Sequence, residues 1–293
     1  MLTINNISKS YGPIQALKNV SFDVPQGCVF GILGPNGSGK TTLLGILLDV
    51  LKADGGTYQW FGNDDAVAAR RQIGSLLETP NFYHYLSAVD NLKIAAAIKK
   101  RGADDIDRVL DIVNLSQRKH SKFHTYSLGM KQRLAIASAL LGNPKVLVFD
   151  EPTNGLDPAG IAEIRELIHR LNEQGITVVM ASHLLDEVEK VCTHVAILKR
   201  GDLLLSGPVN EVLRSEDQIE VSAGDLVNLQ AVLQHMPGIK DVKRNNGILT
   251  LSCSDTLQPA EINQYAATNG ITLSHLLLKK KSLETKFMEL TNN

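Results

Sequence analysis

The chain has 293 residues, of which 43% are hydrophobic, and its formal net charge is −1. This length suits one large domain with a small one, and the balanced charge gives no reason to expect a nucleic-acid partner. No uncharged apolar run approaches the ~18 residues that span a bilayer, and the N-terminus lacks the features of a signal peptide. We therefore expect a cytosolic polypeptide whose three widely spaced cysteines are reduced.

The first strong motif is a glycine-rich loop between a predicted buried strand, Cys28–Leu33, and a predicted apolar-faced helix that continues through Leu48. The loop reads G-P-N-G-S-G-K-T, which is the phosphate-binding P-loop pattern. Its lysine is expected to reach the β- and γ-phosphates, and its threonine hydroxyl to hold Mg²⁺. The residues expected to bind nucleotide are Gly34, Pro35, Asn36, Gly37, Ser38, Gly39, Lys40, Thr41 and Thr42.

A more helical insert follows the P-loop. Ser87 and Asp90 have the spacing of a capping-box variant and predict a helix that runs through Ile98. Asp105–Leu115 predicts a second helix, with its apolar residues on one face. Short β-rich runs then alternate with helical stretches up to about Ser215, which predicts a largely parallel sheet flanked by helices. Gly201-Asp202 predicts a hairpin turn near the end of this region.

Two acidic residues follow a predicted buried strand in the second half of this region. Val146–Phe149 is apolar, and Asp150 and Glu151 come directly after it. An acid at such a strand end can hold Mg²⁺ beside a P-loop, usually through water. The next acid is placed to act as general base on an attacking water. We therefore predict that Asp150 is a metal ligand and that Glu151 is catalytic.

The pattern changes after about Ser215. Predicted strands at Gln218–Val221, Ile239–Lys243, Ile248–Cys253 and Ile271–Leu278 alternate with predicted helices at Leu226–His235 and Pro259–Thr268. The order βαββαβ predicts a small ferredoxin-like unit, and a final helix is expected at Ser282–Leu290. The predicted fold is thus an α/β nucleotide-binding domain at 1–215, with a helical subdomain at about 79–143, and an α+β domain at 216–293.

Further motifs, in order, give the chain a resemblance to the ATP-binding-cassette (ABC) ATPases. Tyr126–Arg133 resembles the family signature, usually L-S-G-G-Q, with Leu128 in place of the first glycine and Met130 in place of the glutamine. Pro152–Pro158 resembles the D-loop, and Ser182-His183 resembles the switch histidine. The resemblance implies a head-to-tail homodimer in which the signature of one chain contacts ATP held by the P-loop of the other. The residues with roles implied in this way are Ser127, Gly129 and Met130 in the signature, Asp157 in the D-loop, His183 in catalysis and Tyr11 on adenine.

The chain departs from the family after the predicted strand at Ile73. Glu78 stands where the family usually has the Q-loop glutamine, and a carboxylate is a harder ligand for Mg²⁺ than an amide. We therefore expect Glu78 to join the metal site. A glutamate at this position and the S-L-G-M-K-Q-R signature occur together in exporter-type subunits related to bacitracin and lantibiotic self-protection transporters. The two features therefore narrow the resemblance to that group. The aromatic run Asn81–Leu86 is interpreted either as a groove for a helix of a membrane subunit or as a local mini-core.

These features predict the ATPase subunit of an ABC exporter, with ATP and Mg²⁺ as cofactors. Its partners would be a second copy and a polytopic permease, on the cytoplasmic face of the membrane. The cargo would be a peptide antibiotic, a drug or an amphiphile. The alternative is a soluble ABC ATPase that acts on a ribosome or DNA, although such proteins usually carry two cassettes or a long coiled coil. The predicted ferredoxin-like tail argues against an importer subunit. The intact Asp150, Glu151 and His183 argue against a scaffold that binds ATP without hydrolysing it.

Overall fold

The computed structural model describes residues 1–62, 65–77, 80–214, 218–245, 247–253 and 257–279, together with Leu283 and Phe287. The chain divides into two compact units, Met1–Gly207 and Pro208–Asn293. The boundary expected at about Ser215 and the expected metal ligand Glu78 lie outside the described residues, as does nearly all of the closing helix expected at Ser282–Leu290. None of the helices in the described part is long and apolar enough to cross a membrane.

The first unit is built on a six-stranded sheet with the order β5-β6-β7-β3-β8-β9. All pairings from β5 through β8 are parallel. Every residue of β3, β6 and β7 is buried, as expected for a parallel sheet that is covered on both faces. The strands are β3 (Val29–Leu33), β5 (Ile73–Leu76), β6 (Val146–Asp150), β7 (Thr177–Ser182), β8 (His194–Lys199) and β9 (Asp202–Pro208).

The connection from β8 to β9 is a tight turn. It consists of Arg200 and Gly201, with φ angles of 49° and 85°. Two successive positive φ angles are typical of the type I′ turns that join paired strands. The hairpin predicted from the sequence is therefore present, one residue earlier than expected.

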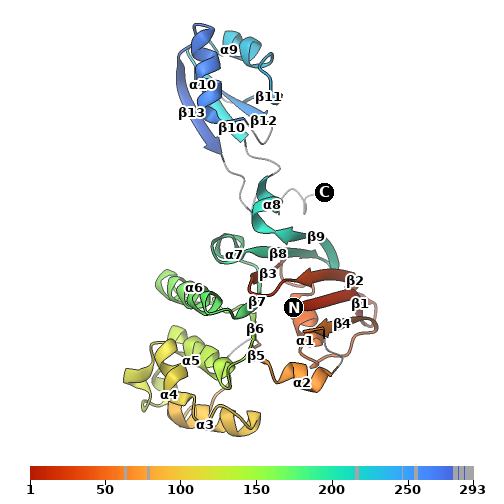
Figure 1. Ribbon diagram of the computed structural model, residues 1–293, viewed down its shortest axis with the longest axis vertical. Helices are drawn as coiled ribbons and strands as arrows, with labels where there is room; N and C mark the ends of the chain where they lie inside the picture. The colour runs from red at the N-terminus through yellow and green to blue at the C-terminus, as the bar shows by residue number, and fades with distance from the viewer. Residues whose placement is uncertain are drawn as a thin grey trace. The chain divides into compact units, whose positions relative to one another are not determined.

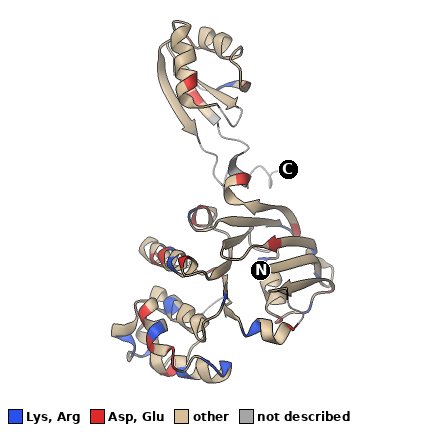
Figure 2. Ribbon diagram, in the orientation of Figure 1, with Lys and Arg blue, Asp and Glu red and all other residues tan. Residues whose placement is uncertain are grey.

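Figure 1 shows this sheet from its edge, with helices on one side and a second sheet on the other. The helices on the first side are α5 (Leu128–Leu140), α6 (Pro158–Glu173) and α7 (Leu185–Val191). On the other side lie α1 (Lys40–Leu47), α2 (Ala66–Arg70) and the antiparallel sheet of β1 (Leu2–Tyr11), β2 (Ile14–Val24) and β4 (Gly55–Trp60). The main core fills the space between the two sheets, where Phe22 and Phe30 stack at 5.3 Å. The outer helix α6 buries only its apolar stripe, and acidic and basic residues are mixed along it (Figure 2).

The helical insert contains α3 (Ala88–Lys99), α4 (Ile106–Ile112) and two short 3-10 turns, Ser116–Arg118 and Phe123–Thr125, before α5. The predicted cap of α3 is confirmed, because Ser87 Oγ accepts from the Asp90 amide at 3.1 Å. The second predicted helix is shorter than Asp105–Leu115. Asn114 has a φ of 54°, and a left-handed residue of this kind ends a helix.

The second unit has its own sheet and core. Its elements are α8 (Val209–Arg214), β10 (Gln218–Ala223), α9 (Leu226–Leu233), β11 (Ile239–Asn245), β12 (Ile248–Cys253), α10 (Pro259–Thr268) and β13 (Leu273–Lys279). The four strands form an antiparallel sheet in the order β11-β12-β10-β13. The buried residues include Val221, Leu229 and Ile262. The predicted βαββαβ order is confirmed, although β13 begins at Leu273 rather than at Ile271.

Candidate nucleotide-binding site

The candidate site lies at the edge of the parallel sheet where β3, β6 and β7 end. Leu33 of β3 pairs with Ser182 of β7, and Asp150 of β6 pairs with Ala181. The P-loop and His183 follow β3 and β7 directly, whereas Asp150 is the last residue of β6 and Glu151 comes next. Because parallel strands present their carboxyl ends at one edge, the register alone brings together three motifs that are far apart in the sequence.

The P-loop is a tight backbone turn that leads into α1. The Ser38 amide donates to Pro35 O at 3.1 Å. Gly39 has a φ of 108°, and a Cβ at that position would lie 2.5 Å from Ala16 O, so only glycine fits there. Ser38 Oγ is buried and has no hydrogen-bond partner among the described residues. A buried polar atom of this kind at the N-terminus of a helix fits a phosphate ligand.

Lys40, at the start of α1, is the central cation of the site. It is only 6% exposed, and its Nζ donates to Gly34 O at 2.8 Å. Glu151 Oε1 lies 3.4 Å from the same Nζ. The other carboxylate oxygen of Glu151 accepts a hydrogen bond from His183 Nδ1 at 2.9 Å. Three residues that the sequence assigned separately are therefore joined in one chain of contacts.

The second pair of polar residues consists of Thr41 and Asp150. Thr41 Oγ1 donates to Asp150 Oδ2 at 2.7 Å, and Asp150 is 1% exposed. Both groups offer oxygen ligands, which hard cations such as Mg²⁺ prefer. No group of three or more His, Cys, Asp or Glu side chains in the described part of the chain could hold a metal by itself. This pair fits an ion that takes its other ligands from water and phosphate.

Glu151 has an unusual backbone as well as two side-chain partners. Its φ is 50°, in the left-handed region that costs a non-glycine residue about 1–2 kcal/mol. Its amide donates to Ala181 O at 3.0 Å, and its carbonyl accepts from the Asn154 amide at 3.1 Å. These bonds hold the strained residue in place and aim its side chain at Lys40 and His183. Local sequence patterns did not predict this strain.

Comparison with known proteins identifies the family. Residues 17–154 match the family model described as ABC transporter. The bacitracin transport ATP-binding protein of Bacillus licheniformis is 36% identical over 99% of this chain and 97% of its own length. A lantibiotic transport ATP-binding protein of Streptococcus pyogenes is 40% identical over 70% of this chain and 90% of its own. A dimeric structure of a bacterial ABC transporter cassette aligns with a TM-score of 0.63 and 30% identity, covering 71% of this chain and 99% of that one.

The chain belongs to the ABC transporter ATP-binding proteins. The resemblance inferred from the motifs is thereby confirmed, and with it ATP binding and an ATPase activity coupled to transport. The α/β cassette fold is likewise confirmed for the part that aligns with the solved structures.

The signature of this ABC ATPase lies on the other side of the sheet from its P-loop. Ser127 caps α5, and its Oγ accepts from the Met130 amide at 3.3 Å. Figure 1 places α5 and α1 on opposite sides of the strands. Ser127 is exposed and Gly129 is partly exposed. The structure therefore does not bring the signature onto the P-loop of its own chain.

Two other expected contact residues lie at element ends. Tyr11 ends β1, is 47% exposed, and pairs with Ile14 across the β1–β2 hairpin. The second strand of this hairpin touches the P-loop, because Ala16 O lies against Gly39. Asp157 caps α6, and its Oδ1 accepts from the Gly160 amide at 3.0 Å.

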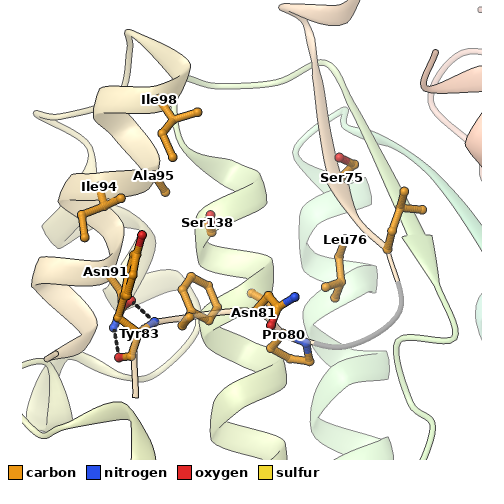
Figure 3. A pocket seen from close by; sticks show the side chains of 13 residues that line it. Ser75, Leu76, Pro80, Asn81, Tyr83, Asn91, Ile94, Ala95, Ile98 and Ser138 are labelled. Carbon is orange, nitrogen blue, oxygen red and sulfur yellow. Dashed lines mark hydrogen bonds between the residues drawn. The ribbon is translucent and has the colours of Figure 1, made fainter. Parts of the chain in front are cut away.

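The aromatic run after β5 forms both a small core and the wall of a cavity. Phe82 packs edge-to-face on Phe123 at 5.2 Å, whereas Tyr83 and Tyr85 are half exposed or more. The cavity of about 530 Å³ lies between β5, α3 and α5 (Figure 3). Its walls include Leu76, Phe82, Tyr83, Ile94, Ile98 and Ser138.

Asn91 holds this aromatic segment in place and was missed by the sequence reasoning. It is buried in α3, its Oδ1 accepts from the Tyr83 amide at 2.8 Å, and its Nδ2 donates to Tyr83 O at 3.1 Å (Figure 3). The available signal was an amide side chain beside Leu92 in the first half of a predicted helix. A buried asparagine needs several hydrogen bonds, which a neighbouring loop supplies here.

Proposed function

We propose that this chain is the ATP-hydrolysing subunit of an exporter and that it works beneath a separate polytopic permease on the cytoplasmic face of the membrane. The observation that carries the catalytic part of the proposal is the position of the Glu151 carboxylate, between Lys40 Nζ and His183 Nδ1. The transport part is supported by full-length similarity to proteins named bacitracin transport ATP-binding proteins, from Bacillus licheniformis and Enterococcus faecalis.

In this proposal the P-loop residues 34–42 bind the phosphates of ATP, and Lys40 neutralises the β- and γ-phosphates. Its ammonium group is buried and is held by two backbone carbonyls before ATP binds, and phosphate oxygens would replace its contact with Glu151. Tyr11 would stack on adenine. Glu151 would accept the proton of the attacking water as general base, a role worth roughly 10²–10⁴-fold in rate. His183 would orient the carboxylate through Nδ1 and contact the γ-phosphate.

Thr41 and Asp150 would hold Mg²⁺ in this site, the aspartate usually through water. When bound, the ion would neutralise charge on the β- and γ-phosphates. Glu78 is proposed from the sequence as a further ligand. Glu78→Ala is expected to raise the Mg²⁺ concentration needed for half-maximal activity. An unchanged Mg²⁺ dependence, ATPase rate and transport would remove Glu78 from the site.

We further propose a head-to-tail homodimer that shares each ATP between two chains. Ser127, Gly129 and Met130 would contact the nucleotide held by the partner, and Asp157 would lie at the same interface. The outward position of Ser127 supports this arrangement, as does the similarity to a cassette whose dimeric structure is known. Closure on ATP and opening after hydrolysis would then be a ligand-driven population shift.

The cavity beside the aromatic segment 81–86 is the proposed docking place for a helix of the permease. It is open and apolar on the side of Ile94 and Ile98. The cargo is proposed to be a peptide antibiotic, a drug or an amphiphile, by analogy with the named relatives. The α+β unit is proposed to be ferredoxin-like, because βαββαβ connectivity with the strand order β11-β12-β10-β13 is that of the split βαβ arrangement.

The test uses the full chain in two measurements. Phosphate release from ATP should require Glu151, and Glu151→Gln should bind ATP, accumulate as a dimer and turn over poorly. Tagged chain isolated from detergent-solubilised cells should bring down a polytopic membrane protein. Isolation with ribosomes or DNA instead would refute the exporter proposal and support the soluble alternative.

A further inference from the structure

Two leucine–glycine pairs lie where the signature faces the D-loop within one chain. Leu128 is the first residue of α5, and a Cβ at Gly155 would lie 3.3 Å from Leu128 Cδ2. In the opposite direction, a Cβ at Gly129 would lie 4.0 Å from Leu156 Cδ2. Leu128 therefore lies close to Gly155, and Leu156 lies near the open side of Gly129. Gly155 also has a φ of 75°, a backbone conformation that residues with a side chain rarely adopt.

The D-loop side of this contact leads directly to Glu151. The Asn154 amide donates to Glu151 O at 3.1 Å, and the Leu156 amide donates to Thr153 O at 3.3 Å. Pro152 and Thr153 are buried between these two bonds. The turn from Glu151 to Leu156 is thus a short, hydrogen-bonded unit, and Gly155 lies between the two residues whose amides make its bonds, Asn154 and Leu156.

Leu128 is an unusual residue for its position. It is 46% exposed, and it stands where the related signature usually has glycine. A glycine there has no side chain with which to reach Gly155. A solitary exposed leucine needs no special explanation, but this one lies against a motif that begins directly after the proposed general base.

We propose that Leu128 is a positioning residue that braces the D-loop against the first turn of α5 and thereby sets the position of Glu151. The proposal rests on the proposed function, in which Glu151 is the base and the signature meets the nucleotide of a second copy. When Ser127 and Gly129 of one chain contact the ATP held by the partner, Leu128 then affects where Glu151 of the same chain lies over its own ATP. The contact makes the two sites of the dimer depend on each other.

The test compares ATP turnover of the full-length variants L128G and L128M with that of wild type. L128G should lower kcat about tenfold while KM changes less than about twofold, because small displacements of a catalytic group cost rate rather than binding. L128M should keep kcat within about twofold of wild type, because the methionine side chain fills the same space beside Gly155. The Hill coefficient for ATP should fall in L128G and recover in L128M.

Val67→Gly is the matched control for the effect of glycine on a helix. Val67 lies in the first turn of α2 after its cap Asp65 and is 54% exposed, so V67G reports the general cost of glycine without touching the site. The midpoint of thermal unfolding should shift no more in L128G than in V67G. A kcat of L128G within about twofold of wild type, or equal losses in L128G and L128M, would overturn the proposal.

A double-mutant cycle tests the reciprocal contact. L128A and L156A should lower kcat by factors whose product exceeds the loss in the double variant, because both leucines lie between the same two segments and residues coupled through a shared backbone shift are not additive. Multiplicative losses would refute the brace. Glu151→Gln is measured alongside: full turnover there refutes Glu151 as base, whereas an inactive E151Q with an unaffected L128G refutes only the role of Leu128.

Discussion

Replacement of Glu151 by glutamine should separate catalysis from binding. The change keeps the shape of the side chain but removes the charge that lies 3.4 Å from Lys40 Nζ. Turnover should fall by roughly 10²–10⁴-fold, because an amide cannot accept the proton from water. ATP binding should not weaken, because Lys40 keeps its bonds to Gly34 O and Pro35 O.

The ion pair also gives the size of the expected change in affinity. At 3.4 Å and an effective dielectric constant of about 20, the gross attraction between the two charges is about 5 kcal/mol. When ATP binds to wild type, Lys40 loses this attraction to Glu151 and gains contacts with phosphate. In E151Q there is no such attraction to lose. Desolvation of the two charges and side-chain relaxation offset most of this attraction, which leaves a net benefit of roughly 1 kcal/mol, a Kd for ATP about fivefold lower than in wild type.

The assay is equilibrium binding of radiolabelled ATP, together with phosphate release. The control is Asp107→Asn, because Asp107 of α4 pairs with Lys119 at 2.7 Å and neither residue belongs to a nucleotide motif. It should leave both quantities near wild type. A Kd of E151Q tenfold or more above that of wild type would refute the reasoning about the ion pair. Unimpaired turnover would refute the assignment of the base.

Three further predictions follow from other contacts. Thr41→Ala removes the hydroxyl that bonds Asp150 and should raise the Mg²⁺ concentration for half-maximal ATPase activity about tenfold or more, whereas Thr41→Ser should not; equal behaviour of the two variants would contradict this. Asn91→Ala leaves Tyr83 N without its partner and Tyr83 O with only the Leu86 amide, and it should lower the free energy of unfolding by about 1–3 kcal/mol in denaturant titrations, against no more than about 0.5 for the exposed Lys93→Ala. Burial and the nearby Arg101 lower the pKa of Lys99 from 10.5 to about 8. Between these values the unfolded chain binds more protons, so the unfolding free energy of wild type should rise relative to Lys99→Met by up to about 3 kcal/mol from pH ~7.5 to ~10, and a constant difference would refute the shift.

Local chemistry explains why the motifs and several element ends could be predicted from the sequence. A cap such as Ser87 bonds an amide three residues away, and the P-loop needs only consecutive residues to form its turn. The βαββαβ order of the second unit was also readable, because each element carries its own period and turn signals. The predicted helix boundaries were wrong where one residue adopts a left-handed conformation, as Asn114 does after α4.

Residue types and spacing in the sequence thus determined the ligand class and the family resemblance. The tertiary structure decided which of these residues act together. The bond from Thr41 to Asp150 crosses 109 positions and the bond from His183 to Glu151 crosses 32, and both exist because parallel pairing brings the ends of β3, β6 and β7 to one edge. The contact of Leu128 with Gly155 likewise depends on how α5 packs beside the D-loop. No local pattern encodes such distances, because they follow from the packing of whole elements rather than from the preferences of neighbouring residues.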